Sequence, residues 1–340
     1  MTSVREVRDR AVIRPVKRAV EDQLLDIPGV VAVDIGEKRT AGRTTGQQSI
    51  VVSVERKEPV ELLGESHRIP EHVLGIPTDV VEEAVTLHHA HYRLDDPVPP
   101  LAPVESATVF GGVGISPRRP VTVEPGRAES ASDCHRIGTL GTLVFGYGST
   151  VFTMGLTTFD VACMDDAWSV GDAMLDPQSG REYADLSRAA LSGKVDAAAV
   201  TLAGSLDRCC LIPGIGSVTG QGSAEPGEFV RKSGFGTGLT SATVTSTDAT
   251  VRLDHGPALG VRVLREQLRV TSSDDQPFVG EGDAGAVLVN GDGRVVGLHL
   301  AGSRDGTVGY ACPIADVLAE LDLELAVTFR RLRAQDEYVR

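Results

Sequence analysis

The sequence predicts a mainly β protein with a small α/β region at its N-terminus. From residue 137 onward it contains seven short apolar runs, many alternating with polar residues and separated by glycine, which is typical of a β-sandwich or barrel. The chain of 340 residues holds 38 Gly and 18 Pro but only 4% aromatic residues. This composition indicates a globular chain rich in loops and strands.

The first 92 residues read as a small α/β domain. Residues 1–25 form an amphipathic pattern, although Pro15 argues against one unbroken helix. Two strand-like runs, VVAVDIG and SIVVSVE, follow within residues 27–57, and the polar, glycine-containing stretch between them predicts a hairpin. The proline-rich start of residues 93–136 predicts a linker and surface loop.

Residues 137–325 form the predicted β domain, and residues 326–340 form a tail. REYADLSRAALSG (181–193) is interpreted as a short helix. PIADVLAELDLELAV (313–327) begins with proline and has apolar residues at helical spacing, so it predicts a terminal helix.

Charge and cysteine usage limit the function. The net charge of −14 argues against nucleic acid or an anionic membrane as the main partner. No stretch has the length and hydrophobicity of a membrane span, and the charged N-terminus does not resemble a signal peptide. Five cysteines without a CxxC pair predict reduced thiols and a cytoplasmic location. We expect no cofactor and no metal.

Four motifs occur in a meaningful order. They are GTLGTLV (138–144), VDAAAV (195–200), RKSGFGTGLTSATV (231–244) and GDAGAVLV (282–289). Together they resemble motifs of the trypsin-like (chymotrypsin-fold) serine peptidases, in their intracellular bacterial and narrow-leaf-type plant branch. The segments VVAVDIG, IVVSVERK and GIPTDVVE resemble the extra N-terminal domain of that branch. The resemblance implies a trypsin-like double β-barrel after a small α/β domain, with a C-terminal helix.

The same resemblance implies a degenerate catalytic triad. The orienting aspartate corresponds to Asp196, the position of the catalytic base holds Asp160, and the position of the nucleophile holds Ala284. The oxyanion hole would use the backbone N–H groups of Gly282 and Ala284, which do not depend on the side chain at 284. No other histidine, His255 included, stands where the motif places the base.

These residues lead to three functional hypotheses. The first is a catalytically inactive homologue that serves as a binding or assembly module, with a peptide or protein partner in the former substrate cleft and possible homo-oligomers. The alternative is an active serine peptidase whose nucleophile was substituted at position 284. A purely structural protein would instead fill the cleft with its own side chains.

Several residues allow two interpretations. Asp160 and Asp196 could share a proton or bind a cation, or they could be a hydrogen-bonded remnant of the old site. The histidines of LHHAHY (87–92) could bind zinc, but an exposed strand end is favoured. Cys163 is interpreted as a buried, inert thiol. Phe235 stands where the branch usually has arginine, which puts the usual substrate pocket in doubt.

Overall fold

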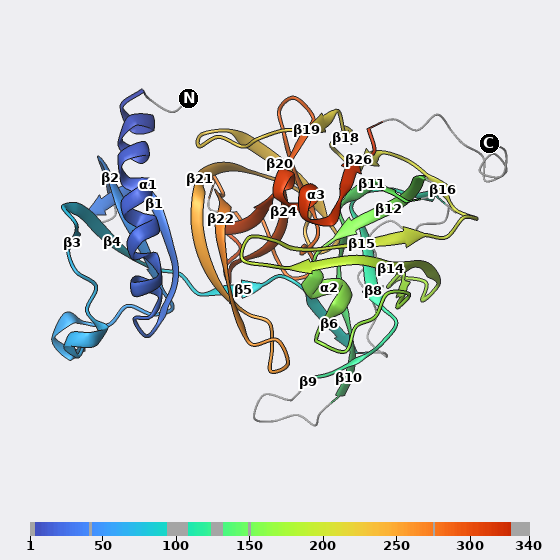
Figure 1. The fold of residues 1–340 in the computed structure, drawn as a ribbon, viewed down its shortest axis with the longest axis horizontal. Helices are drawn as coiled ribbons and strands as arrows, with labels where there is room; N and C mark the ends of the chain where they lie inside the picture. Colours follow the sequence, from blue (N-terminus) through green and yellow to red (C-terminus); the bar gives the residue numbers. More distant parts are fainter. Residues whose placement is uncertain are drawn as a thin grey trace.

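The computed structural model describes residues 4–40, 43–93, 108–123, 132–148, 151–274 and 276–327. The predicted mainly β fold class is confirmed, with an N-terminal α/β region and a helix near the C-terminus. The N-terminal region lies beside two larger β units (Figure 1). No helix in the described ranges is both long and apolar enough to cross a membrane.

In the N-terminal region, one long helix covers a sheet. The elements are α1 (Val4–Leu25), β1 (Val30–Thr40), β2 (Arg43–Val54), η1 (Val60–Leu62), η2 (Glu65–His67), β3 (His72–Val73) and β4 (Ile76–Glu82). The doubt raised by Pro15 is wrong, because α1 continues through it. Ile13 and Leu24 of this helix are buried in one core with Ile35 and Ile50. This tertiary packing offsets the lost backbone hydrogen bond.

The first large unit is a ten-stranded sheet curved around an apolar core. Its order is β26 (Leu323–Leu325), β11 (Thr142–Tyr147), β12 (Val151–Thr157), β15 (Asp196–Leu202), β14 (Glu182–Leu191), β13 (Ala173–Leu175), β8 (Val113–Pro117), β10 (Ser132–Leu140), β6 (Ala90–Arg93), with β9 (Val121–Val123) on β10. The short helix α2 (Phe159–Cys163) follows β12.

The second large unit is a closed barrel of six strands, because β20 pairs with both β23 and β21. The strands are β20 (Phe229–Gly234), β23 (Val287–Asn290), β24 (Arg294–Ser303), β25 (Val308–Pro313), β22 (Val261–Thr271) and β21 (Gly238–Asp254). On β24 two further strands pair, β19 (Gly220–Gln221) and β5 (Val85–Leu87). The remaining pairs are β7 (Thr108–Val109) with β16 (Asp207–Arg208), and β17 (Leu211–Ile212) with β18 (Gly216–Ser217).

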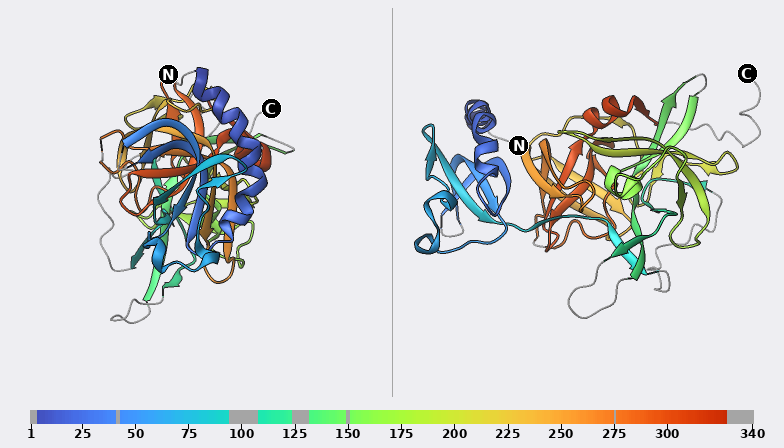
Figure 2. Two further views of the ribbon diagram at one scale, coloured as in Figure 1. Left: turned by 90° about the vertical axis from the view of Figure 1, so that its left-hand side faces the viewer. Right: turned by 60° about the horizontal axis from the view of Figure 1, so that its bottom comes forward.

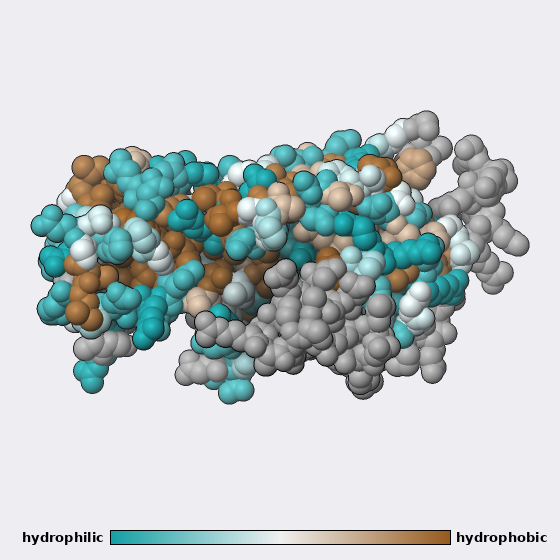
Figure 3. Space-filling model, turned by 90° about the horizontal axis from the view of Figure 1, so that it is seen from below, coloured by the Kyte–Doolittle hydropathy of each residue, from teal (hydrophilic) through white to brown (hydrophobic). Residues whose placement is uncertain are grey.

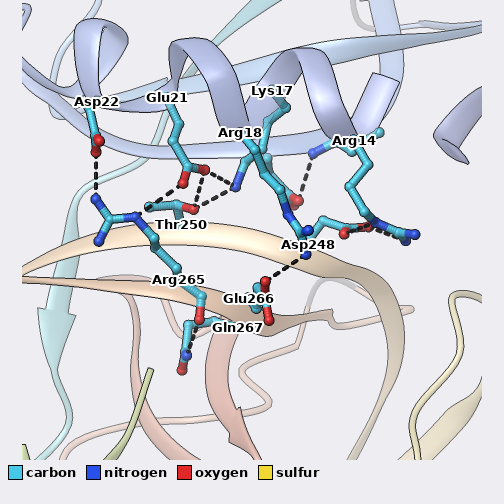
Figure 4. A network of polar contacts seen from close by, with 12 residues as sticks. Arg14, Lys17, Arg18, Glu21, Asp22, Asp248, Thr250, Arg265, Glu266 and Gln267 are labelled. Atoms are coloured by element: carbon cyan, nitrogen blue, oxygen red, sulfur yellow. Dashed lines mark hydrogen bonds and ion pairs between the residues drawn. The ribbon is translucent and has the colours of Figure 1, made fainter. Parts of the chain in front are cut away.

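The N-terminal sheet continues into the second barrel, because β1 pairs with β21. Polar side chains of α1 reach across this junction (Figure 4). Lys17 pairs with Glu21 at 2.5 Å, and Thr250 of β21 donates a hydrogen bond to Glu21 at 2.7 Å. All three are buried, so the charges are compensated inside the interface.

Seen from below, the polar surface is interrupted by apolar side chains, some over the N-terminal region (Figure 3).

Three sequence predictions need correction. Residues 181–193 were predicted as a short helix, but they contain β14, whose pairing with β13 and β15 outweighs local propensity. The predicted terminal helix is shorter: α3 (Ile314–Leu321) ends at Asp322, which has a left-handed backbone, and β26 then pairs with β11. The predicted linker 93–136 contains β8 and the beginning of β10, both of the first sheet.

Two of the predicted segments, the proline-rich linker and the C-terminal tail, lie partly outside the described residues. The proline-rich residues 94–107 and the tail beyond residue 327 lie outside the described residues. Residues 85–92, predicted as part of the N-terminal domain, leave it and run along the two β units (Figures 1 and 2).

Candidate functional site

The turn that contains Ala284 is hydrogen-bonded to both β units: the Ala284 carbonyl accepts from Thr139 N–H of β10, and Gly285 N–H donates to the His299 carbonyl of β24, each at 2.8 Å. Gly282 and Gly285 have φ values of +90° and +98°, which favour glycine, and a Cβ on Gly285 would lie 2.0 Å from the Thr139 carbonyl oxygen. The Ala284 side chain is 0% exposed. This backbone conformation aims the N–H groups of Gly282 and Ala284 at one point.

A buried ion pair between Lys232 and Asp283 supports the turn that contains Ala284. The Asp283 carboxylate lies 2.9 Å from the Lys232 ammonium, and both side chains are fully buried. It also accepts hydrogen bonds from the backbone N–H groups of Gly236, Thr237 and Gly280, each at 3.0 Å. Burial lowers the pKa of Lys232, while Asp283 opposes that change.

The acceptor in front of the turn is the chain's own backbone. The carbonyl oxygen of His88 accepts hydrogen bonds from Gly282 N–H at 2.7 Å and from Ala284 N–H at 3.1 Å. Two converging N–H groups on one carbonyl oxygen are the arrangement that an oxyanion hole provides. The His88–His89 peptide bond therefore lies directly over the position predicted for the nucleophile.

On both sides of His88 the chain is bound as a strand. We refer to Val85–Arg93 as the cleft segment. Its β5 pairs antiparallel with β24, in the register Thr86 opposite Gly302, and His88 N–H donates to the Leu300 carbonyl at 3.0 Å. Its β6 pairs with β10 of the other sheet. The cleft segment thus passes from one β unit to the other across the site.

The predicted base position belongs to a compensated polar cluster. Asp160 of α2 contacts the Arg136 guanidinium at 2.8 Å and His89 Nδ1 at 2.5 Å. Burial raises the pKa of the Asp160 carboxyl, but the charges of His89 and Arg136 outweigh this and hold it below its ordinary value. Asp160 is therefore an ionised acceptor.

Asp196, at the start of β15, has a separate basic partner. One of its oxygens accepts the Asp160 backbone N–H at 3.1 Å, and the other lies 2.8 Å from His255 Nε2. Burial lowers the pKa of His255, yet the hydrogen bond and charge of Asp196 raise it overall. Because each carboxylate has its own basic neighbour, Asp160 and Asp196 need not share a proton.

Two other predicted features can be placed. Cys163 is buried, and burial raises the pKa of its thiol, which disfavours the nucleophilic thiolate. Phe235 is buried in a small core with Ala90 and Ile137, against the cleft segment. Among the residues that the structure describes, no group of three or more His, Cys, Asp or Glu side chains is placed to hold a metal.

Sequence reasoning missed four contacts of this site: those of His88, His89, Arg136 and His255. The exposed strand end predicted for the histidines of LHHAHY is wrong for His88, which is 3% exposed. Its ring packs beside His299, with Nδ1 of His88 at 3.0 Å from Nε2 of His299. Only the fold brings these residues together, because the bonded pairs are far apart in sequence.

Comparison with known proteins found similarity to solved structures of bacterial serine proteases. No protein-family model matches the chain, and no curated protein is significantly similar to it. Similar solved structures include Thermobifida fusca protease A (21% identity, 65% of this chain, 100% of that one, TM-score 0.47). Others are Nocardiopsis protease (18%, 64% and 98%, 0.46) and a glutamic acid-specific serine protease described as using a histidine triad in substrate binding (18%, 64% and 100%, 0.45). At these sequence identities, the similarity concerns the fold and says nothing about activity.

The buried imidazoles make the docking of the cleft segment depend on pH. Burial lowers the pKa of His88 to about 4, against 6.5 for an exposed histidine. The released segment therefore takes up a proton between pH 6.5 and 4, whereas the docked one does not. Docking is fully stable above pH 6.5 and is expected to lose up to about 3 kcal/mol as the pH falls to 4.

Hydrogen exchange followed by mass spectrometry, corrected for the intrinsic pH dependence, would measure this loss. Amides of residues 85–92 should become less protected at pH 4.5 than at pH 7.5, whereas amides of β15 should change less. His88→Gln, which has no imidazole, should reduce the difference. Equal protection of residues 85–92 at both pH values would contradict this account.

Proposed function

We propose that this chain is a catalytically inactive trypsin-like peptidase homologue that works as a binding or assembly module. The observation that carries the proposal is the chemistry around the His88 carbonyl. A methyl side chain, that of Ala284, stands at the nucleophile position, and a carboxylate paired with Arg136 stands at the base position. The methyl group offers no nucleophile, and the Asp160 carboxylate, whose pKa is held below its ordinary value by His89 and Arg136, is a weak base.

The N–H groups of Gly282 and Ala284 retain binding capacity. They hold a peptide carbonyl without any contribution from the residue 284 side chain, and β24 supplies the edge on which an extended strand adds. The module therefore binds peptide backbone in the orientation of a substrate. In this chain the peptide is the cleft segment, which fastens the N-terminal region to both β units.

Hydrolysis by the unaltered protein tests the proposal. Fluorescent casein and a peptide library, incubated with the protein at pH 7.5, should be cleaved no faster than in a blank. A bacterial serine protease of the same fold serves as the positive control. Cleavage that persists after repurification, and that is lost on His255→Ala, would overturn the proposal and identify a base.

The alternative is a serine peptidase whose nucleophile was substituted at position 284. The formed pair of N–H donors and the substrate-like path of the cleft segment favour it. This alternative requires a base at position 160, where the chain has a carboxylate instead of an imidazole. The inactive homologue therefore accounts for both substituted positions, and the alternative for one. Homo-oligomers and a cytoplasmic location remain part of the proposal.

A further inference from the structure

The contacts of the cleft segment are those that a separate peptide could make. Backbone bonds on both sides of His88, to Leu300, Gly282 and Ala284, need only an extended chain. The next residue, His89, contacts the Asp160 carboxylate, and Ala90 is buried against Ile137. The site thus recognises one backbone register and a few side chains.

The pocket around His88 is shaped for an imidazole. A Cβ on Gly302 would lie 2.6 Å from Cε1 of His88, so glycine at this position makes room for the ring. Nε2 of the fully buried His299 lies 3.0 Å from Nδ1 of His88, and one neutral ring donates to the other. An apolar side chain in place of His88 would leave Nε2 of His299 without its partner, and a buried hydrogen bond would be lost.

Burial also favours a neutral ring at this position. Burial is the largest cause of the lowered pKa of His88; the Asp283 carboxylate raises this pKa, and the Lys232 ammonium lowers it. A lysine or arginine side chain would bring a second cation towards Lys232 and His299. The pocket therefore selects a polar, uncharged, ring-sized group, and histidine at neutral pH has all three properties.

We propose that the cleft is a selective receptor for extended peptides with histidine at the position of His88, and that the cleft segment is its built-in ligand. A histidine-bearing segment of a partner protein, of the type Leu-His-His-small, takes its place when the cleft segment leaves. This inference rests on the proposed function, because a ligand that was cleaved would not remain bound.

The test uses the full chain with its own segment weakened. His88→Pro removes both the imidazole and the N–H that bonds to Leu300. His88→Gly, which removes the side chain but keeps the backbone N–H, serves as a second host. Fluorescein-labelled peptide AVTLHHAHYR, corresponding to residues 84–93, is titrated at pH 7.5 and followed by anisotropy. Circular dichroism and thermal melting establish that each host is folded.

The labelled peptide should bind the hosts at least about tenfold more tightly than the unaltered chain, whose cleft is occupied. A peptide with leucine in place of the first histidine should bind about tenfold more weakly, because one buried hydrogen bond is lost. In a host that also carries His299→Leu, this preference should disappear. That loss ties the selectivity to the pocket and not to the label.

Three outcomes would overturn the inference. They are no binding to either folded host, equal binding of both peptides, and a preference that survives His299→Leu. Mass spectrometry of the bound peptide separates this inference from the function on which it rests. Selective binding with cleavage of the peptide would contradict the inactive homologue and leave the histidine selectivity standing.

Discussion

Combining Asp160→His with Ala284→Ser is expected to make the protein cut its own backbone between His88 and His89. The introduced hydroxyl would lie beside the His88 carbonyl carbon, whose oxygen already accepts hydrogen bonds from Gly282 and Ala284. The bond to be broken is thus aligned before any catalysis occurs, which removes the entropic cost of binding a substrate.

Each step of this cleavage has an assigned group. The hydroxyl attacks the carbonyl carbon and its proton passes to the introduced imidazole, which Asp196 is close enough to orient, since it already bonds to the backbone of residue 160. The imidazole then protonates the leaving nitrogen of His89. Water hydrolyses the resulting ester and releases two fragments, residues 1–88 and 89–340.

Intact-mass spectrometry over a time course measures the products. The double variant should react at least about 10²-fold faster than either single variant, because each of these lacks the nucleophile or the base. Adding Asp196→Asn should slow it again. Fragments ending at another residue would show that the cleft segment has a different register. An intact double variant, folded and stable for days, would show that the site cannot be restored by these two groups.

Replacing Lys232 by methionine is expected to destabilise the protein by about 3–5 kcal/mol. Asp283 would remain buried with no cation, and removing one partner of a buried ion pair costs that much. The effect should reach the candidate site, because Asp283 receives the N–H groups of Gly236, Thr237 and Gly280. The turn that presents Gly282 and Ala284 would lose its support.

Urea unfolding of the purified variants measures this loss. Lys194→Met is the matched control, because Lys194 pairs with Glu266 while its side chain remains half exposed, and such surface pairs contribute about 0–1 kcal/mol. Similar losses in the two variants would mean that the Lys232–Asp283 pair is no more important than a surface contact. Retained protection of residues 85–92 in the Lys232 variant would mean that the pair does not support the turn.

Local patterns in the sequence predicted the framework of the site well. Alternating apolar runs and glycine turns predicted a mainly β fold, since side-chain periodicity depends only on neighbouring residues. GDAGA marks a tight turn whose glycines have left-handed backbones, and residues 196–200 of VDAAAV form most of β15. The roles assigned to Asp160, Asp196 and Ala284 remain predictions from the resemblance.

The partners of these residues could not be predicted in the same way. His255 and Asp196 are 59 positions apart, and nothing in either neighbourhood indicates the other. Residues 181–193 suggested a helix because their propensities are local, whereas the strand that they form depends on distant neighbours. The path of the cleft segment depends on its pairing with β24 and β10, and both of these strands come later in the sequence.

The order of these parts along the chain bears on how the protein is made. Residues 85–93 leave the ribosome before either sheet that binds them, and Thr86 must wait for Gly302, about 200 residues later. Contacts so distant in sequence form slowly, and an unpaired strand exposed meanwhile invites association with other chains. The cleft segment is rich in histidine and flanked by acidic residues, Glu82 and Glu83 among them. Such polar residues keep an unpaired strand in solution and disfavour its association with other chains. Closing the cleft is therefore expected to come late in folding, because the cleft segment can dock only after both β units have formed.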